Sequence, residues 1–146
     1  MPNLIKLSGT LHRARIWQSI NQSIANDVDV KINYNTVDFD IGGITDISNS
    51  KIIIKKEGYY RMTAFHQITA GSVSAKYIQK IFINGVQVGA GGNAQSITET
   101  PSPGVTVTKL LQVDDVVEGY VFQGTASNKA LVASQSKVYL EVDKLL

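Results

Sequence analysis

Few residues of this chain have side chains that could carry catalysis. The sequence contains two histidines, His12 and His66, and no cysteine, which excludes a thiol nucleophile and a thiolate-bound metal. The Gly-x-Ser-x-Gly turn of serine hydrolases is also missing from the sequence. His66 falls on the apolar side of an alternating run, where a buried structural histidine is more common than a catalytic one. We therefore expect a protein that is not an enzyme.

Two of the acidic residues offer an alternative chemistry. Asp38 and Asp40 would share one face of a strand, where two carboxylates could bind Ca²⁺ or act as an acid/base pair. Charges at this spacing also suit the solvent side of an edge strand, where they discourage unwanted pairing, and we favour that interpretation. Asp114 and Asp115 are better explained as turn residues. The sequence therefore predicts no metal ion and no cofactor.

The charge and hydropathy of the chain argue against nucleic acid and membrane partners. The formal net charge of the 146 residues is +2, and the longest basic run is Lys55-Lys56. A surface that follows a phosphate backbone needs clustered Lys and Arg, so we expect no nucleic-acid binding. Every apolar stretch is well short of the roughly 18 residues that cross a bilayer, so we also expect no membrane insertion.

The elements that position these side chains follow from a period of two. Tyr60, Met62 and Ala64 alternate with polar residues, as do Val138 and Leu140 near the end of the chain. This pattern predicts strands with one buried face, and similar runs recur from about residue 28 to residue 146. We predict an all-β fold, a jelly-roll sandwich of eight to ten antiparallel strands in a single domain over residues 12–146.

The first 26 residues allow two interpretations at two places. Residues 1–11 predict either an assembly arm or an ordinary first strand, and the arm would use the apolar side chains Leu4, Ile5, Leu7 and Leu11. Residues 12–26 contain a helical stripe of Ile16, Ile20 and Ile24. The same segment is rich in Ser and Asn, which are poor helix formers, so we favour a strand followed by an irregular connection.

The second half of the chain contains the strongest turn signal and the longest predicted loop. Asn84-Gly85 between two apolar runs predicts a two-residue hairpin. Residues 89–104 are rich in Gly, Asn, Gln, Ser and Thr and predict a polar loop. Asn93, Gln95 and Thr98 in this loop could hydrogen-bond a glycan, although a plain solvated loop has the same composition. The aromatic residues expected in the core or between subunits are Trp17, Phe39, Tyr60, Phe82, Tyr120, Phe122 and Tyr139.

Six short motifs, taken in order, resemble one known superfamily. They are ARIWQS at 14–19, VKINYN at 30–35, GYY at 58–60, IFING at 81–85, LLQVDDVV at 110–117 and SKVYLEV at 136–142. Together they resemble the globular heads of complement q and tumour necrosis factor, in their phage or bacterial form. Asp114 stands where this superfamily usually has glycine. The resemblance implies a jelly roll that assembles as a homotrimer and buries aromatic and aliphatic side chains near the threefold axis.

These features lead to a main hypothesis and two alternatives. The main hypothesis is a non-enzymatic structural protein of a virion, a trimeric decoration or appendage protein of a bacteriophage particle that contacts capsid or tail proteins. One alternative is the head of a tail fibre that binds a host receptor, either a surface glycan or a protein. The other is a bacterial extracellular interaction domain, which would place the protein outside the cell or on its surface.

Overall fold

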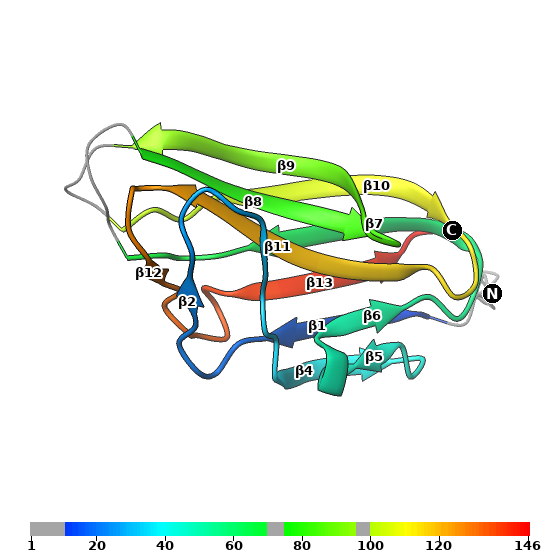
Figure 1. Ribbon diagram of the computed structural model, residues 1–146. Coiled ribbons are helices and arrows are strands. Elements are labelled where there is room, and N and C mark those ends of the chain that lie inside the picture. Colours follow the sequence, from blue (N-terminus) through cyan, green and yellow to red (C-terminus); the bar gives the residue numbers. More distant parts are fainter. Residues whose placement is uncertain (1–10, 70–74, 96–99) are drawn as a thin grey trace, which may run out of the picture.

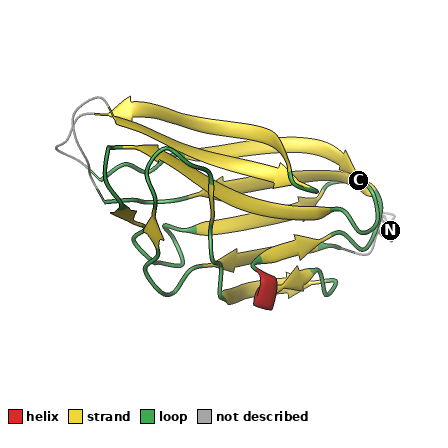
Figure 2. Cartoon of the chain, viewed as in Figure 1, coloured by secondary structure: helices red, strands yellow, loops and turns green. Residues whose placement is uncertain are grey.

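The computed structural model describes residues 11–69, 75–95 and 100–146 (Figure 1). Within these ranges the chain forms thirteen strands, four of which have only two residues, and one short 3-10 turn at Ile47–Asn49 (Figure 2). Two large antiparallel sheets pack face to face and enclose the apolar core. The predicted all-β jelly-roll sandwich is therefore confirmed.

The first sheet has the strand order β10-β7-β13-β1-β4. Its members are β1 (Arg13–Trp17), β4 (Thr36–Ile41), β7 (Gly58–Phe65), β10 (Gly104–Leu111) and β13 (Tyr139–Lys144). Strand β1 and the irregular connection after it agree with the preferred interpretation of residues 12–26. Alternation then decides which side chains enter the core, because Ala14 and Ile16 are buried whereas Arg13, Arg15 and Trp17 face outward.

The second sheet has the strand order β5-β6-β11-β8-β9, and β3 also pairs with β11. Its members are β3 (Val30–Lys31), β5 (Thr45–Asp46), β6 (Lys51–Ile53), β8 (Ala75–Ile83), β9 (Val86–Gln95) and β11 (Val116–Gly124). A separate small ladder joins β2 (Ser23–Ile24) to β12 (Lys129–Ala130). Asn84 and Gly85 have φ values of 51° and 78°, so the predicted hairpin between β8 and β9 is confirmed.

Strand β9 corrects the prediction of a polar loop over residues 89–104. The strand continues to Gln95, and β10 begins at Gly104. The glycines that suggested a loop have a packing role instead. A Cβ atom on Gly89 would collide with the side chain of Val107, and one on Gly91 would collide with the carbonyl oxygen of Gly104. Glycine at these two positions therefore lets β9 approach β10 of the other sheet closely.

The alternating residues from Tyr59 to about Ala70 predict one long strand, but strand β7 is shorter than this prediction. It ends at Phe65, and the backbone N–H groups of two later residues donate to proline carbonyls: His66 N to Pro103 O at 3.1 Å and Ile68 N to Pro101 O at 3.1 Å. Proline has no N–H group, so the neighbouring segment cannot return the reciprocal bonds of an antiparallel ladder. The two prolines therefore end the strand pairing.

Tyr34 is a core residue that the sequence pattern did not identify. Residues 33–35 predict a turn, and Asn33 and Asn35 are exposed, but the side chain of Tyr34 is fully buried. Its hydroxyl reaches β11 at Gly119, where an added Cβ atom would collide with the hydroxyl. The Tyr34 hydroxyl has no hydrogen-bond partner among the described residues. Burial raises the pKa of Tyr34 far above its ordinary value, so the phenol stays neutral.

Candidate functional site

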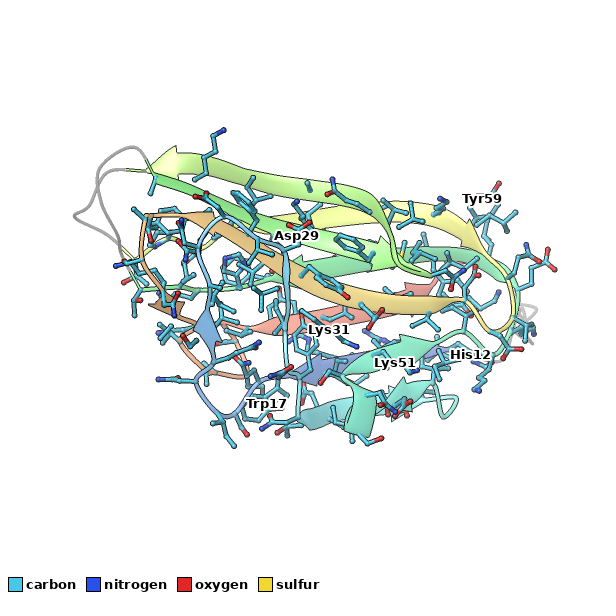
Figure 3. All side chains as sticks on the ribbon, in the orientation of Figure 1. His12, Trp17, Asp29, Lys31, Lys51 and Tyr59 are labelled. Atoms are coloured by element: carbon cyan, nitrogen blue, oxygen red, sulfur yellow. The ribbon has the colours of Figure 1, made fainter. Side chains whose placement is uncertain are left out.

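An aromatic row lies on the outward face of the first sheet. Trp17 on β1 pairs with Tyr139 on β13, and Tyr139 pairs with Phe65 on β7. The Tyr139 and Phe65 rings stack with centroids 5.9 Å apart. The next partner in register is Gly104, where an added Cβ atom would lie 3.0 Å from Phe65 Cδ2. We call Trp17, Tyr139 and Phe65 the aromatic row; it faces away from the core, and each member is only partly buried. Figure 3 labels Trp17, the member on β1.

A charged network adjoins the aromatic row on the same face. The Arg13 guanidinium donates to Asp143 at 2.9 Å, and the Arg15 guanidinium donates to Glu141 at 2.6 Å. Arg61 reaches the second oxygen of Asp143 at 3.3 Å. The Arg15 guanidinium also lies over the Tyr139 ring, 4.4 Å from its centroid. The charges of this face are therefore paired largely within one chain.

His66 is a core histidine, as its position in the alternation predicted. Its side chain is fully buried, and Nδ1 lies 2.8 Å from Gln79 Oε1. The Gln79 amide nitrogen donates to the Tyr120 carbonyl at 3.0 Å, which orients the amide so that Oε1 accepts from His66 Nδ1–H. Burial lowers the pKa of His66 to about 4, and the bond to Gln79 opposes this shift only in part. Such a histidine is neutral near pH 7 and sealed from any substrate.

The two strand aspartates have separate structural roles. Asp40 accepts hydrogen bonds from Ile44 N at 2.8 Å, from Thr45 N at 3.1 Å and from the Thr45 hydroxyl at 2.7 Å. Burial on its own would raise the pKa of Asp40, but these bonds, with one from Gly43, outweigh it and lower the pKa. Asp38 accepts from Gln135 at 2.6 Å. A Ca²⁺ ion at this pair would have to displace these bonds.

Comparisons with known proteins identify the fold of this two-sheet sandwich. No family model matches the chain, and no curated protein matches it. Solved structures do match. Murine APRIL at pH 5.0 superimposes with a TM-score of 0.72 at 11% identity, covering 92% of this chain and 99% of that chain. The globular domain of zebrafish complement 1qA gives 0.70 at 11% identity, covering 93% and 98%. The fold is the tumour necrosis factor and complement-q jelly roll.

A third match extends the likeness to an insect protein. Eiger TNF from S. frugiperda superimposes on this chain with a TM-score of 0.69 at 12% identity, covering 94% of each chain. The resemblance read from six short motifs is thus confirmed at the level of the fold. Its phage or bacterial type stays a prediction.

The seven predicted aromatic residues divide into three groups on this jelly roll. Tyr60 is fully buried in the core, and its hydroxyl donates to the Lys56 carbonyl at 2.7 Å. Trp17, Phe39 and Tyr139 lie on the outward face of the first sheet. Phe82, Tyr120 and Phe122 lie on the outward face of the second sheet, where the Phe82 and Tyr120 rings are 4.3 Å apart. The prediction therefore combined surfaces that the fold keeps apart.

Phe65 belongs to the aromatic row, but it was not among the aromatic residues predicted from the sequence. Its parity on β7 is opposite to that of the buried residues Met62 and Ala64, and this was a usable signal for an outward position. Its proximity to Tyr139 could not be predicted, because the pairing of β7 with β13 joins segments far apart in the chain.

Aspartates at 114 and 115 form the predicted turn, with Asp114 at a φ of 72°.

Several predicted site residues fall outside the described part of the chain. Leu4, Ile5 and Leu7 of the predicted arm lie outside it, and Leu11 is half exposed at its border. Thr98 also lies outside it, as do the side chains of Asn93 and Gln95, whose backbone belongs to β9. The predicted arm and the predicted glycan contacts of these three residues therefore stay predictions.

Between residues 11 and 146, gaps aside, no helix has the length and apolar character needed to cross a bilayer. In the same ranges no three side chains of His, Asp or Glu are grouped so that they could hold a metal ion.

Proposed function

We propose that this chain is a non-enzymatic structural protein that works as a homotrimer through the outward face of its first sheet. The observation that carries the proposal is the aromatic row of Trp17, Tyr139 and Phe65, three large side chains in register on the outward side of the sheet, each partly exposed among the described residues. Aromatic side chains concentrated on one face favour burial against another protein surface.

The charged network supports a partner that is another copy of the same chain. Arg13 and Arg61 share Asp143, and Arg15 pairs with Glu141, so the face carries pairs rather than a patch of one sign. Burying an unpaired charge costs several kcal/mol, and a hydrogen-bonded partner of opposite charge offsets part of that cost. Such a face can lie at the interface between copies around a threefold axis without like-charge repulsion, and most homo-oligomers have closed rotational symmetry.

We place this trimer on a bacteriophage particle, as a decoration or appendage protein that contacts capsid or tail proteins. Two observations support this placement. The sequence motifs resemble those of the phage members of the superfamily, and the charged and aromatic residues described above make structural contacts. The alternatives remain the head of a tail fibre that binds a host receptor and a bacterial extracellular interaction domain. Mass spectrometry and electron microscopy of purified particles test this placement; finding the protein only as a free cytoplasmic monomer would contradict it.

The mass of the purified protein in solution tests the trimer. Three copies of the 15.9 kDa chain have a mass of about 48 kDa, which light scattering after size exclusion distinguishes from one or two copies. Phe65→Glu should shift the protein toward monomer, because an anchor residue at an interface contributes about 2 kcal/mol or more, roughly thirtyfold in the dissociation constant.

Phe122→Glu is the matched control for this experiment. Phe122 is a partly buried phenylalanine on the outward face of the other sheet, so the same substitution there should leave the mass unchanged. A monomeric wild-type protein, or an equal loss of mass in both variants, would refute assembly through the aromatic row.

A further inference from the structure

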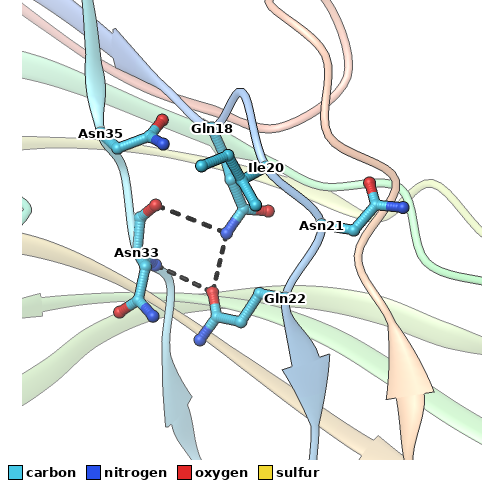
Figure 4. Close-up of a pocket in the computed structure, with 6 residues that line it drawn as sticks. All are labelled: Gln18, Ile20, Asn21, Gln22, Asn33 and Asn35. Carbon is cyan, nitrogen blue, oxygen red and sulfur yellow. Dashed lines mark hydrogen bonds between the residues drawn. The ribbon is translucent and has the colours of Figure 1, made fainter.

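A small pocket lies between two chain connections at one end of the sandwich. It has a volume of about 230 Å³ and is lined by Gln18, Ile20 and Asn21, Gln22, Asn33 and Asn35 (Figure 4). The first four residues come from the connection between β1 and β2, and the last two come from the connection between β3 and β4. Five of the six lining residues are carboxamides, and none is charged. We call it the carboxamide pocket.

The pocket is held in shape by hydrogen bonds between the two connections. Asn35 N donates to the Trp17 carbonyl at 3.0 Å, and Asn33 N donates to Gln22 Oε1 at 2.9 Å. The Gln22 amide nitrogen in turn donates to the Lys31 carbonyl at 2.8 Å. Gln22 is therefore fixed at both ends of its amide, and the walls exist before any ligand arrives.

The fixed Gln22 determines the orientation of Gln18. Because Gln22 Oε1 can only accept, the group that faces it at 2.8 Å must be the amide nitrogen of Gln18. This leaves the carbonyl oxygen Oε1 of Gln18 without a hydrogen-bond partner among the described residues. Gln18 is only 1% exposed, so this acceptor is also withheld from water. A buried acceptor without a partner costs about 1–3 kcal/mol, and a ligand that donates to it would recover this cost.

Ile20 lies beside Gln18 on the pocket wall and is 68% exposed. An exposed side chain changes rotamer in picoseconds to nanoseconds, so Ile20 can turn aside and admit a donor to Gln18 Oε1. Ile20 is also the one apolar residue among those that line the pocket. The side-chain oxygen of Asn21 accepts a hydrogen bond from Ala133 N, and that of Asn35 accepts one from Ser19 N. The side-chain nitrogens of Asn21 and Asn35 donate no hydrogen bond within the described residues.

We infer that the carboxamide pocket binds one ring of a neutral saccharide. Carboxamides both donate and accept, as sugar hydroxyls do, and the lack of charged lining residues disfavours phosphates, carboxylates and metal ions. The volume corresponds to seven or eight waters at about 30 Å³ each, which suits one pyranose ring rather than an oligosaccharide. This inference rests on the receptor-head alternative above and not on trimer formation, because every lining residue belongs to one chain.

The first test is chemical-shift mapping on the full-length, ¹⁵N-labelled wild-type protein. The probes are the methyl glycosides of glucose, galactose, mannose and N-acetylglucosamine, with inorganic phosphate and acetate as anionic comparisons. We expect at least one glycoside to shift the side-chain amide resonances of Gln18, Asn21 and Asn35, with a dissociation constant of about 1 mM. No shift at these amides up to about 50 mM of any glycoside would overturn the inference, and so would a response to the anions alone.

The second test is the substitution Gln18→Met, which keeps the side-chain volume but removes the unpartnered oxygen. The bond to Gln22 is lost, while the cost of the buried acceptor is relieved, so we expect the melting temperature to change little. Glycoside binding should weaken about three- to tenfold, the value of one hydrogen bond.

Gln87→Met is the matched control, because the side chain of Gln87 is exposed on β9 and makes no hydrogen bond among the described residues. Unchanged binding in Gln18→Met, or equal weakening in both variants, would overturn the inference. If Gln18→Met does not fold, the shifts in the wild-type protein still decide. The mass measurement that tests the trimer is independent of all these results.

Discussion

Titration of His66 should make the stability of this protein depend on pH between 7.5 and 4.5. Burial lowers its pKa from an ordinary 6.5 to about 4 in the folded protein. The unfolded chain therefore binds a proton at a pH where the folded chain does not, and protonation favours unfolding. The stabilisation is fully present above pH 6.5 and is lost as the pH falls toward 4.

The magnitude follows from the two pKa values. Each pH unit between them is worth about 1.36 kcal/mol, and the curvature near the lower pKa reduces the total loss at pH 4.5 to about 2.5 kcal/mol. Asp40 contributes outside this window, because its lowered pKa removes stability only as the pH falls below its ordinary value of 3.8. A loss of this size is a large part of the 5–15 kcal/mol that stabilises a typical domain.

Urea unfolding at pH 7.5, 6.5, 5.5 and 4.5 measures this loss. The protein concentration has to be constant, because an oligomer gains stability with concentration. His66→Gln is the decisive variant, since its amide can still donate to Gln79 but does not titrate. Its unfolding free energy should change little across the window, whatever its absolute value. A flat pH profile in the wild-type protein, or the same slope in His66→Gln, would refute the reasoning.

Three further substitutions have expected effects that thermal or urea unfolding can measure. Tyr34→Phe removes a buried hydroxyl without a partner among the described residues and should raise stability by about 1 kcal/mol; a loss above 1 kcal/mol would show that the hydroxyl is bonded. Gly119→Ala should lower stability by about 1–3 kcal/mol because its Cβ meets that hydroxyl, and the double variant with Tyr34→Phe should recover part of the loss; strict additivity would contradict the contact. Asp40→Ala should lower stability by about 1–3 kcal/mol, since Ile44 N and the two Thr45 donors lose their acceptor, and an unchanged midpoint would show that water replaces it.

The parts of the fold that could be predicted depend on neighbours in the sequence. Alternation identified the buried face of β7 through Tyr60 and Met62, because the period of a strand is local. The hairpin at Asn84-Gly85 was equally readable, since both residues tolerate positive φ. The glycines of β9 led to a wrong prediction, because a run of Gly and Asn is typical of loops. The close approach of these glycines to β10 depends on a strand in the other sheet, which the local sequence does not reveal.

The candidate sites were harder to predict because they join distant segments. The aromatic row needs the register of β1, β13 and β7, which the order of residues does not reveal, so Phe65 was missed although Trp17 and Tyr139 were named. The carboxamide pocket depends on contacts between residues 18–22 and residues 33–35. The segment around Tyr34 suggested only a turn, since nothing local shows that Gly119 leaves space for a ring.

The close approach of β9 to β10 has a consequence for where this molecule can diversify. Along the stretch where Gly89 and Gly91 face Val107 and Gly104, any larger residue would push the two sheets apart. At this border of the sandwich the two sheets are packed so closely that few substitutions are tolerated. The side chains of Ile20 and Asn33 in the two connections, by contrast, are exposed. Descendants of this chain should therefore acquire new binding specificities at the connections, while the residues of the β9–β10 contact stay nearly constant.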